Sequence, residues 1–218
     1  MKAVIINCTL KLSPQFSNTD ALIQKAVAQF KGMGISSEVI RLVDHDVKPG
    51  NEADMGKGDE WPAILKKIKA CNIFIIATPI WMGHIASPTQ LVIERLDAIF
   101  HDESLSDAKT GQFFTYNKVA GCLITGNEDG AHACAAHVLW SMQECGFTIP
   151  PNVNAYWVGM AGAGKDYVEA GGEQWYYTNY TLRYMTANLA WFAKLLKDNP
   201  IDTNLNELRE LAKKESPR

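Results

Sequence analysis

The chain has 218 residues, of which 47% are hydrophobic and 21% are charged, and its formal net charge is −3. These values are ordinary for a globular protein, and the length suits one well-packed domain. The weak negative charge gives no electrostatic reason to expect nucleic acid or an anionic membrane as a partner, and no apolar run reaches the length of a membrane span. The apolar run after Lys2 is too short for the core of a secretory signal, so we expect a cytoplasmic protein.

Five cysteines are scattered along the chain, and no two of them have C-x-x-C spacing. An odd number without close spacing argues against a disulfide scaffold and against an iron–sulfur cluster. Cys8 and Cys122 lie in apolar, strand-like runs, where cysteine usually acts as a small buried hydrophobe.

The first half of the chain alternates between short apolar runs, typical of buried strands, and helical patterns. The predicted elements are strands at residues 2–8, 37–42 and 72–77, helices at residues 18–33 and 61–70, a polar loop at residues 44–58, and a third helix that ends near Phe100.

The second half continues the alternation after residues 101–117, which have no clear period. The predicted elements are strands at residues 118–125 and 153–158, helices at residues 129–145 and 173–197, a Gly-rich loop at residues 159–172, and a short helix at residues 205–212. This order predicts an α/β fold, a doubly wound parallel sheet of five strands with helices on both faces. We expect a single domain over residues 1–200 and a polar C-terminal tail with a short helix over residues 201–218.

The loop after the third strand offers flat apolar surface. Proline cannot donate a hydrogen bond within a central strand, so the strand is predicted to end at Ala77. The following residues combine apolar side chains with free backbone N–H groups, which suits a planar heteroaromatic ring with polar edges. A turn whose aromatic side chain packs on the protein is the alternative. The candidate ring-binding residues are Pro79, Ile80, Trp81, Met82 and Gly83.

The loop after the first strand is rich in hydroxyl groups and carries one lysine. It leads into a helix start, whose N–H groups favour an anion such as phosphate. It contains neither a P-loop nor a Rossmann glycine pattern. The alternative is a helix N-cap with polar solvation. The candidate phosphate-binding residues are Thr9, Lys11, Ser17, Asn18 and Thr19.

The loop after the fourth strand has two glycines and an aspartate before a helix. It is either a tight turn with an N-cap or a backbone wall against the polar edge of a ring. Its candidate residues are Thr125, Gly126, Asn127, Asp129 and Gly130. Three such loops at adjacent strand ends predict a mononucleotide site. A flavin fits better than a purine, because its ring has a polar edge with several acceptors.

These motifs resemble those of the NAD(P)H-dependent FMN reductase group of the flavodoxin-like superfamily. Residues 78–97, TPIWMGHIASPTQLVIERLD, resemble its ring-loop and helix motif, which usually reads close to P-I-Y-W-G-x-x-x-x-x-x-K-x-x-x-D-R. Ser17-Asn18-Thr19 resembles the end of its phosphate loop, and GNEDGA, GFTIPP and YWVG resemble its last strands. The usual G-S-P-R-x-x-S start is absent, with Lys11 where an arginine often sits, and Gln90 stands where a lysine is common.

The resemblance implies a flavodoxin-like sheet of order 2-1-3-4-5 and non-covalent FMN. It implies an FMN-dependent oxidoreductase that takes a hydride from NAD(P)H and passes electrons to a small-molecule acceptor, a quinone or free flavin. It further implies a homodimer or homotetramer in which a second subunit helps to wall the ring. Two alternatives remain open, an FMN-binding electron carrier without its own substrate turnover and a fold that has lost its cofactor.

No nucleophile–base pair can be picked out, so we predict no catalytic side chain, because a flavin carries the chemistry itself. His132, Cys134 and His137 are too few and too poorly aligned to predict a metal site. His84 is a candidate hydrogen-bond donor to a flavin or substrate, although exposure to solvent is more usual. Tyr156 and Trp157 stand where a nicotinamide or quinone enters, or belong to the core.

The last long helix has two apolar faces, so we expect the chain to self-associate. Tyr180, Tyr184 and Trp191 form one stripe, and Met185 and Leu189 belong to the other. One face can pack on the sheet, and large apolar patches left on a surface usually mark interaction sites.

Overall fold

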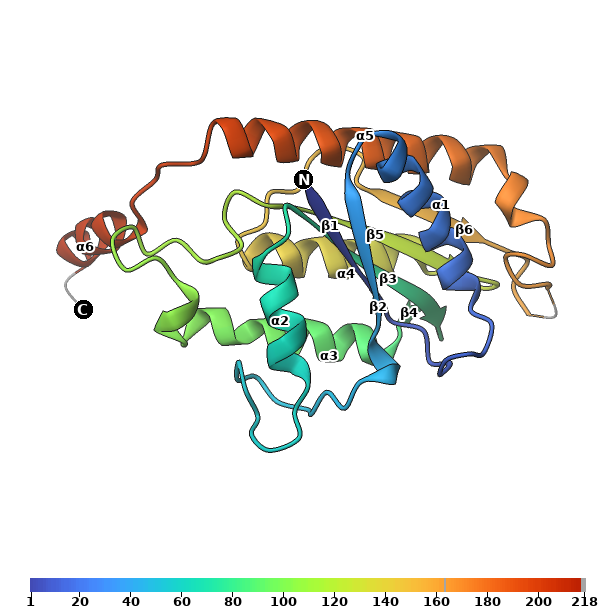
Figure 1. The fold of residues 1–218 in the computed structure, drawn as a ribbon, viewed down its shortest axis with the longest axis horizontal. Helices are drawn as coiled ribbons and strands as arrows, with labels where there is room; N and C mark the ends of the chain where they lie inside the picture. Colours follow the sequence, from blue (N-terminus) through green and yellow to red (C-terminus); the bar gives the residue numbers. More distant parts are fainter. Residues whose placement is uncertain (163, 217–218) are drawn as a thin grey trace.

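Five parallel strands form the centre of the computed structural model, which describes residues 1–162 and 164–216 (Figure 1). The strands are β1 (Lys2–Asn7), β2 (Ser36–Arg41), β3 (Ile73–Trp81), β5 (Val119–Gly126) and β6 (Asn154–Val158). Their order in the sheet is β2-β1-β3-β5-β6, and the short β4 (His84–Ile85) pairs antiparallel with the end of β3. Counted without β4, this is the predicted order 2-1-3-4-5, so the α/β sheet prediction is confirmed.

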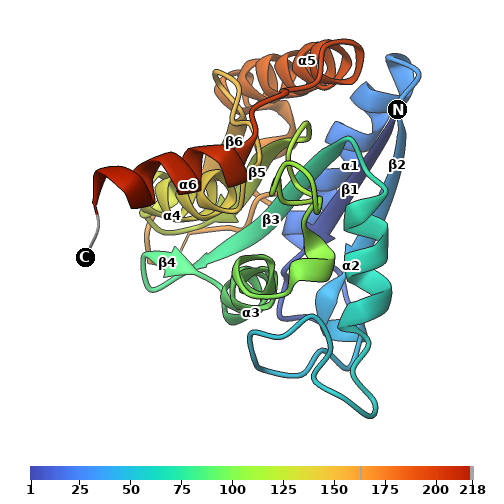
Figure 2. The same cartoon turned by 90° about the vertical axis from the view of Figure 1, so that its left-hand side faces the viewer.

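Helices cover both faces of the sheet (Figures 1 and 2). On one face lie α1 (Asn18–Gly32) and α5 (Tyr176–Asp198), and on the other lie α2 (Trp61–Lys69), α3 (Ser87–Leu96) and α4 (Ala131–Glu144). Successive strand side chains point to opposite faces, so Val4 and Ile6 pack under one helical layer while Ala3 and Ile5 pack under the other.

The prediction that the third strand ends at Ala77 is wrong, because β3 continues through Pro79 to Trp81 and turns back into β4. Strand β1 ends at Asn7, opposite Ala77, so only β5 still pairs with β3 at Pro79. Proline is tolerated there because the position has become a sheet edge, where no neighbour needs its missing N–H group.

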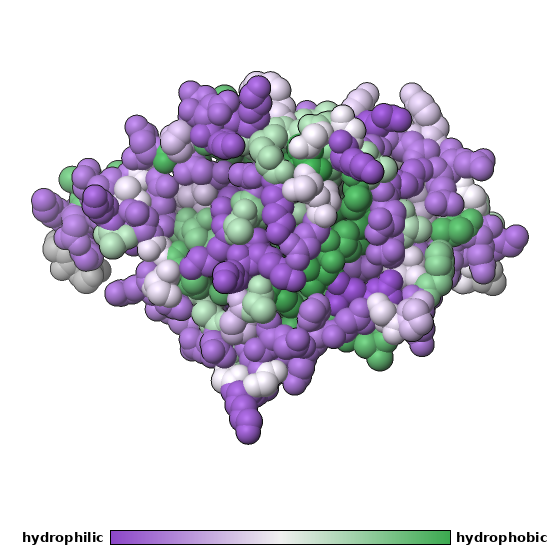
Figure 3. Space-filling model, viewed as in Figure 1, coloured by the Kyte–Doolittle hydropathy of each residue, from purple (hydrophilic) through white to green (hydrophobic). Residues whose placement is uncertain are grey.

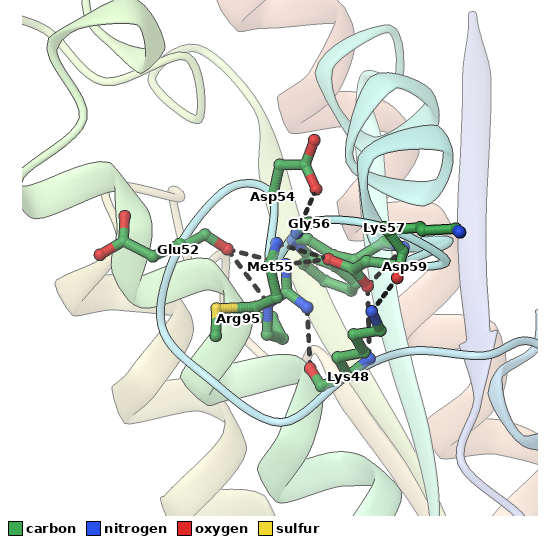
Figure 4. Close-up of polar contacts among 9 residues, drawn as sticks. Lys48, Glu52, Asp54, Met55, Gly56, Lys57, Asp59 and Arg95 are labelled. Atoms are coloured by element: carbon green, nitrogen blue, oxygen red, sulfur yellow. Dashed lines mark hydrogen bonds and ion pairs between the residues drawn. The ribbon is translucent and has the colours of Figure 1, made fainter.

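The polar loop at residues 44–58 is fastened to α3 by Arg95 (Figure 4). The Arg95 guanidinium pairs with Asp59 at 2.7 Å, and it donates to the carbonyl oxygens of Lys48 and Glu52 at 2.8 Å. Both charged side chains are fully buried. Burial raises the pKa of Asp59, but hydrogen bonds from Arg95 and from backbone N–H groups outweigh it and hold the pKa well below its ordinary value.

The edge strand β2 is protected by charge. Figure 3 shows a strip of hydrophobic residues in the region of β2 and α2 on an otherwise mainly hydrophilic face, and within β2 only Val39 and Ile40 are hydrophobic. Glu38, in the middle of β2, pairs with Lys2 at 2.5 Å and with Lys67 at 2.8 Å. Charged side chains on an edge strand discourage pairing with another chain.

The C-terminal segment packs on residues 101–117 rather than on the sheet (Figure 1). Helix α6 (Leu205–Glu215) begins where the Leu205 N–H donates to the Thr110 carbonyl at 2.7 Å, and the Gln112 side chain donates to the Thr203 carbonyl at 2.8 Å. The predicted tail runs to residue 218, of which residues 217 and 218 lie outside the described part. A single domain over residues 1–200 stays a prediction. Within the described ranges, no helix has the length and apolar character needed to cross a membrane.

Candidate functional site

A cavity of about 340 Å³ lies at the carboxyl ends of β1, β3 and β5. This edge of a doubly wound sheet is where ligands usually bind, and the volume lies within the usual range for ligand sites. The predicted residues that line the cavity are Thr9, Lys11, Asn18, Thr19, Pro79, Ile80, Trp81, Thr125, Gly126 and Asn127. The structure therefore brings part of each predicted loop to one place.

The hydroxyl groups of the first loop already have partners within the protein. The Ser17 hydroxyl caps α1 by accepting from the Asp20 N–H at 3.1 Å, and Ser17 does not line the cavity. The Thr19 hydroxyl is paired with that of Thr125 at 2.9 Å. The N-terminal end of α1 and the exposed Lys11 are therefore the groups that most favour an anion here.

Met82 and Gly83 do not line the cavity, because they form the turn between β3 and β4. Their N–H groups, predicted to face a ring, donate instead to the carboxylate of Glu128 at 3.0 and 3.2 Å. Met82 adopts a φ of 52°, in the left-handed region that a non-glycine residue seldom visits. Glu128 therefore fastens the β3–β4 turn to the loop after β5.

Asp129 and Gly130 also lie outside the cavity lining. Gly130 has a φ of 115° and precedes α4, and a Cβ atom there would come within 2.5 Å of the Gly83 carbonyl oxygen. A glycine is required for this contact, so Gly130 serves the packing of two loops against each other.

Several cavity residues escaped the sequence-based prediction. Glu128 lies between predicted residues, and Trp157 was weighed only as an entry point or core residue. Asp166 and Tyr167 come from the Gly-rich loop after β6. The Asn18 side chain donates to the Asp166 carboxylate at 3.1 Å and accepts the Val168 N–H at 3.1 Å. An aromatic residue inside a Gly-rich stretch was the available signal for this loop.

Other reactive side chains do not converge on the cavity. Burial raises the pKa of the Cys8 thiol to about 12, which leaves little thiolate at neutral pH. His132 accepts from or donates to the Tyr156 hydroxyl at 2.9 Å, and neither residue lines the cavity. Among the described residues, no group of three or more His, Cys, Asp or Glu is placed to hold a metal ion.

Comparison with known proteins identifies relatives along the whole chain. Residues 1–160 match the family model described as NADPH-dependent FMN reductase. The 8-demethyl-8-aminoriboflavin-5'-phosphate synthase of Streptomyces davaonensis is 41% identical over 225 residues, covering 99% of this chain and 86% of that protein. The solved structure of RosB with the bound intermediate 8-demethyl-8-formylriboflavin-5'-phosphate has a TM-score of 0.92 at 40% identity, covering 99% of this chain and 88% of that one.

A more distant structure, the apo form of an NADH:FMN oxidoreductase, has a TM-score of 0.60 at 17% identity and covers 91% of both chains. At this identity the likeness concerns the fold alone, and with the strand order it makes the fold flavodoxin-like.

The family match supports FMN as the flavin and NAD(P)H as the reductant, as the sequence predicted. The cavity fits FMN in its chemistry. Pro79, Ile80, Trp81 and Trp157 give apolar walls suited to a ring, while Lys11 and the start of α1 suit a phosphate. Two carboxylates, Glu128 and Asp166, also line the cavity, and they limit where a phosphate can lie.

Proposed function

From the premise that this chain belongs to the NADPH-dependent FMN reductase family, we propose that it binds FMN non-covalently in the cavity described above. It takes a hydride from NAD(P)H and passes electrons to a small-molecule acceptor, a quinone or free flavin. The observation that carries this proposal is the meeting of three loops, from β1, β3 and β5, around one cavity with apolar walls and a helix start.

When bound, FMN supplies the redox-active ring, and the protein supplies binding, orientation and electrostatics. Trp81 and Trp157 would exclude water from the ring, and Lys11 with the start of α1 would balance the phosphate charge. Glu128 fixes the β3–β4 turn, so the position of Trp81 depends on this carboxylate.

Reconstitution tests the cofactor, and turnover tests the reaction. The purified protein, mixed with FMN and desalted, should retain the visible absorption bands of an oxidised flavin. It should then oxidise NADPH or NADH when a quinone or excess FMN is present. Retention of flavin without turnover would favour the alternative of an electron carrier. A protein that neither retains FMN nor quenches its fluorescence would contradict the proposal.

A second candidate function is chemical modification of the flavin ring, with the flavin as substrate. It is favoured by the relative that shares 41% identity across 99% of this chain and whose name describes the synthesis of an aminoriboflavin phosphate. Mass spectrometry of the flavin separates the two functions. An oxidoreductase returns FMN with unchanged mass after many turnovers, whereas a modifying enzyme accumulates a flavin of altered mass.

A further inference from the structure

The hydroxyl of Tyr167 is buried without a hydrogen-bond partner. Among the described residues, only three buried side-chain polar atoms lack a partner, in Ser37, Trp61 and Tyr167, and only Tyr167 lines the cavity. Buried polar atoms in native proteins nearly always have partners, so the unpartnered hydroxyl of a residue that lines a ligand cavity is a candidate for a hydrogen bond that a ligand completes. Burial, with a smaller effect from Glu173, raises the pKa of Tyr167 to about 12, so the hydroxyl is a proton donor at neutral pH.

The loop that carries Tyr167 is shaped to hold its ring. The rings of Tyr167 and Trp157 pack edge to face with centroids 5.5 Å apart. A Cβ atom at Gly172 would overlap the Tyr167 ring, and one at Gly159 would overlap Trp157. The two glycines therefore leave room for the aromatic pair, whose position is set by packing rather than by the hydroxyl.

The neighbours of Tyr167 decide which part of a flavin it meets. Asp166 lines the cavity beside it, and Asn18, the first residue of α1, holds Asp166 and Val168. A carboxylate repels a phosphate but accepts hydrogen bonds from hydroxyl groups. A hydroxyl-rich part of the ligand therefore suits the place beside Asp166 and Tyr167 better than a phosphate does.

We propose that Tyr167 is a specificity-determining residue that donates a hydrogen bond to a ribityl hydroxyl of the flavin. Asp166 accepts a hydrogen bond from the same ribityl chain. This inference rests on the proposed function, because it assigns a role within the proposed FMN site. It makes the ribityl chain, in addition to the ring and phosphate, a part of the ligand that the protein recognises.

The test compares three ligands with Tyr167→Phe, which removes the hydroxyl and keeps the ring on Trp157. Dissociation constants are measured by fluorescence quenching for FMN, riboflavin and lumiflavin, which has the ring without the ribityl chain. The variant should bind FMN and riboflavin roughly tenfold more weakly, the usual effect of one hydrogen bond, and lumiflavin as well as the wild type does. Its ligand-free melting temperature should not fall, because no bond within the protein is lost.

Tyr156→Phe is the matched control. The Tyr156 hydroxyl bonds to His132 and Tyr177 outside the cavity, so this variant should lose thermal stability while its flavin affinities stay unchanged. Asp166→Asn provides a second variant, and it should also weaken the binding of riboflavin more than the binding of lumiflavin.

Equal affinity of Tyr167→Phe and the wild type for all three ligands would overturn the inference and leave the proposed function standing. An equal loss for lumiflavin and riboflavin would also overturn it, since the effect would then concern the ring or the fold. A wild-type protein that binds no flavin would instead remove the proposed function itself, and this inference with it.

Discussion

Thr19 and Thr125 lie 106 positions apart, and their hydroxyl groups share a hydrogen bond of 2.9 Å. Both side chains are buried, so the bond joins the first turn of α1 to the end of β5 at the cavity. The sequence suggested that the Thr19 hydroxyl helps to bind a phosphate and that the loop of Thr125 is either a tight turn or a backbone wall against a ring. In the structure the two hydroxyl groups bond to each other, and this gives the pair a role in stability.

We predict that Thr19→Val lowers the free energy of unfolding by about 1–3 kcal/mol, because it leaves the Thr125 hydroxyl buried without a partner. Thr19→Ser keeps the hydroxyl and should remain closer to the wild type. The double variant Thr19→Val with Thr125→Val removes both polar groups and should recover part of the loss. Urea unfolding of the ligand-free proteins measures all three values, and a Thr19→Val variant as stable as the wild type would contradict the role.

The predicted phosphate site leads to a second test. Ser17→Ala removes the N-cap of α1 and should cost about 0.5–2 kcal/mol of stability. Lys11→Ala removes an exposed charge and should leave the free energy of unfolding within about 0.5 kcal/mol of the wild-type value. It should weaken the binding of FMN more than the binding of riboflavin. Titrations of both ligands, made at one salt concentration, separate the two effects. If Lys11→Ala weakened riboflavin as much as FMN, the phosphate would not lie beside Lys11.

Trp81 gives a third prediction, because its side chain is 52% exposed at the cavity rim. Trp81→Ala should change the stability of the ligand-free protein by less than about 0.5 kcal/mol and weaken FMN binding. Trp61, which is fully buried, is the control, and Trp61→Ala should lose about 3–5 kcal/mol. The assignment of Trp81 to the FMN site would be refuted if Trp81→Ala melted at a clearly lower temperature than the wild type, or if it bound FMN as tightly as the wild type does. Thermal melts and FMN titrations measure the two quantities.

The parallel, doubly wound sheet was predictable because apolar runs of strand length alternate with amphipathic helices, a pattern that local sequence carries, whereas the order of the strands was predicted from the family resemblance. The end of β3 was not predictable, because its extension to Trp81 depends on pairing with β4 and on the end of β1 at Asn7. Both facts concern neighbours in the sheet, which one strand's own residues do not specify.

The site was predictable only as far as single loops determine it. Residues at the ends of adjacent strands meet by topology, so Thr9, Pro79 and Thr125 were placed together correctly. Tyr167 was missed because its loop has no period, and its position depends on glycines that admit the Trp157 ring. The hydrogen bond from the Met82 N–H group to Glu128 was also missed, because Glu128 lies two strands later in the chain and local sequence does not show that the two loops meet.

The buried pair of Arg95 and Asp59 gives a prediction about acid. The folded pKa of Asp59 lies below its ordinary value of 3.8, so the carboxylate contributes stability above that pH and loses the contribution as the pH falls further. Asp59→Asn should therefore show a shallower loss of stability between about pH 4 and pH 2 than the wild type. Arg95→Met leaves the carboxylate buried alone and should cost about 3–5 kcal/mol at neutral pH. An identical acid profile for Asp59→Asn and the wild type would contradict this account.

The last prediction concerns self-association through α5. Met185 and Leu189 are buried against the sheet, as one of the two predicted faces requires, while Tyr184 and Trp191 are 53% and 60% exposed. Trp140, on α4 at the opposite face of the sheet, is 65% exposed and does not belong to this stripe. Helix α6 contacts the segment at residues 108–112, so the described part of the C-terminal tail packs there and not on the exposed side of α5.

We expect the exposed aromatic residues of α5 to be buried by a second copy of the chain, because apolar surface left exposed on a folded protein usually marks an interface. Light scattering should give the mass of a dimer or tetramer, and Trp191→Glu should shift it toward the 24.1 kDa of one chain. Met33→Glu, which changes an exposed apolar side chain at the end of α1, is the control and should leave the mass unchanged. If the second copy helps to wall the ring, Trp191→Glu should also weaken the binding of FMN, in proportion to the fraction of the oligomer that dissociates. A wild-type mass near 24.1 kDa across the micromolar range would reject the oligomer and leave the FMN cavity to a single chain.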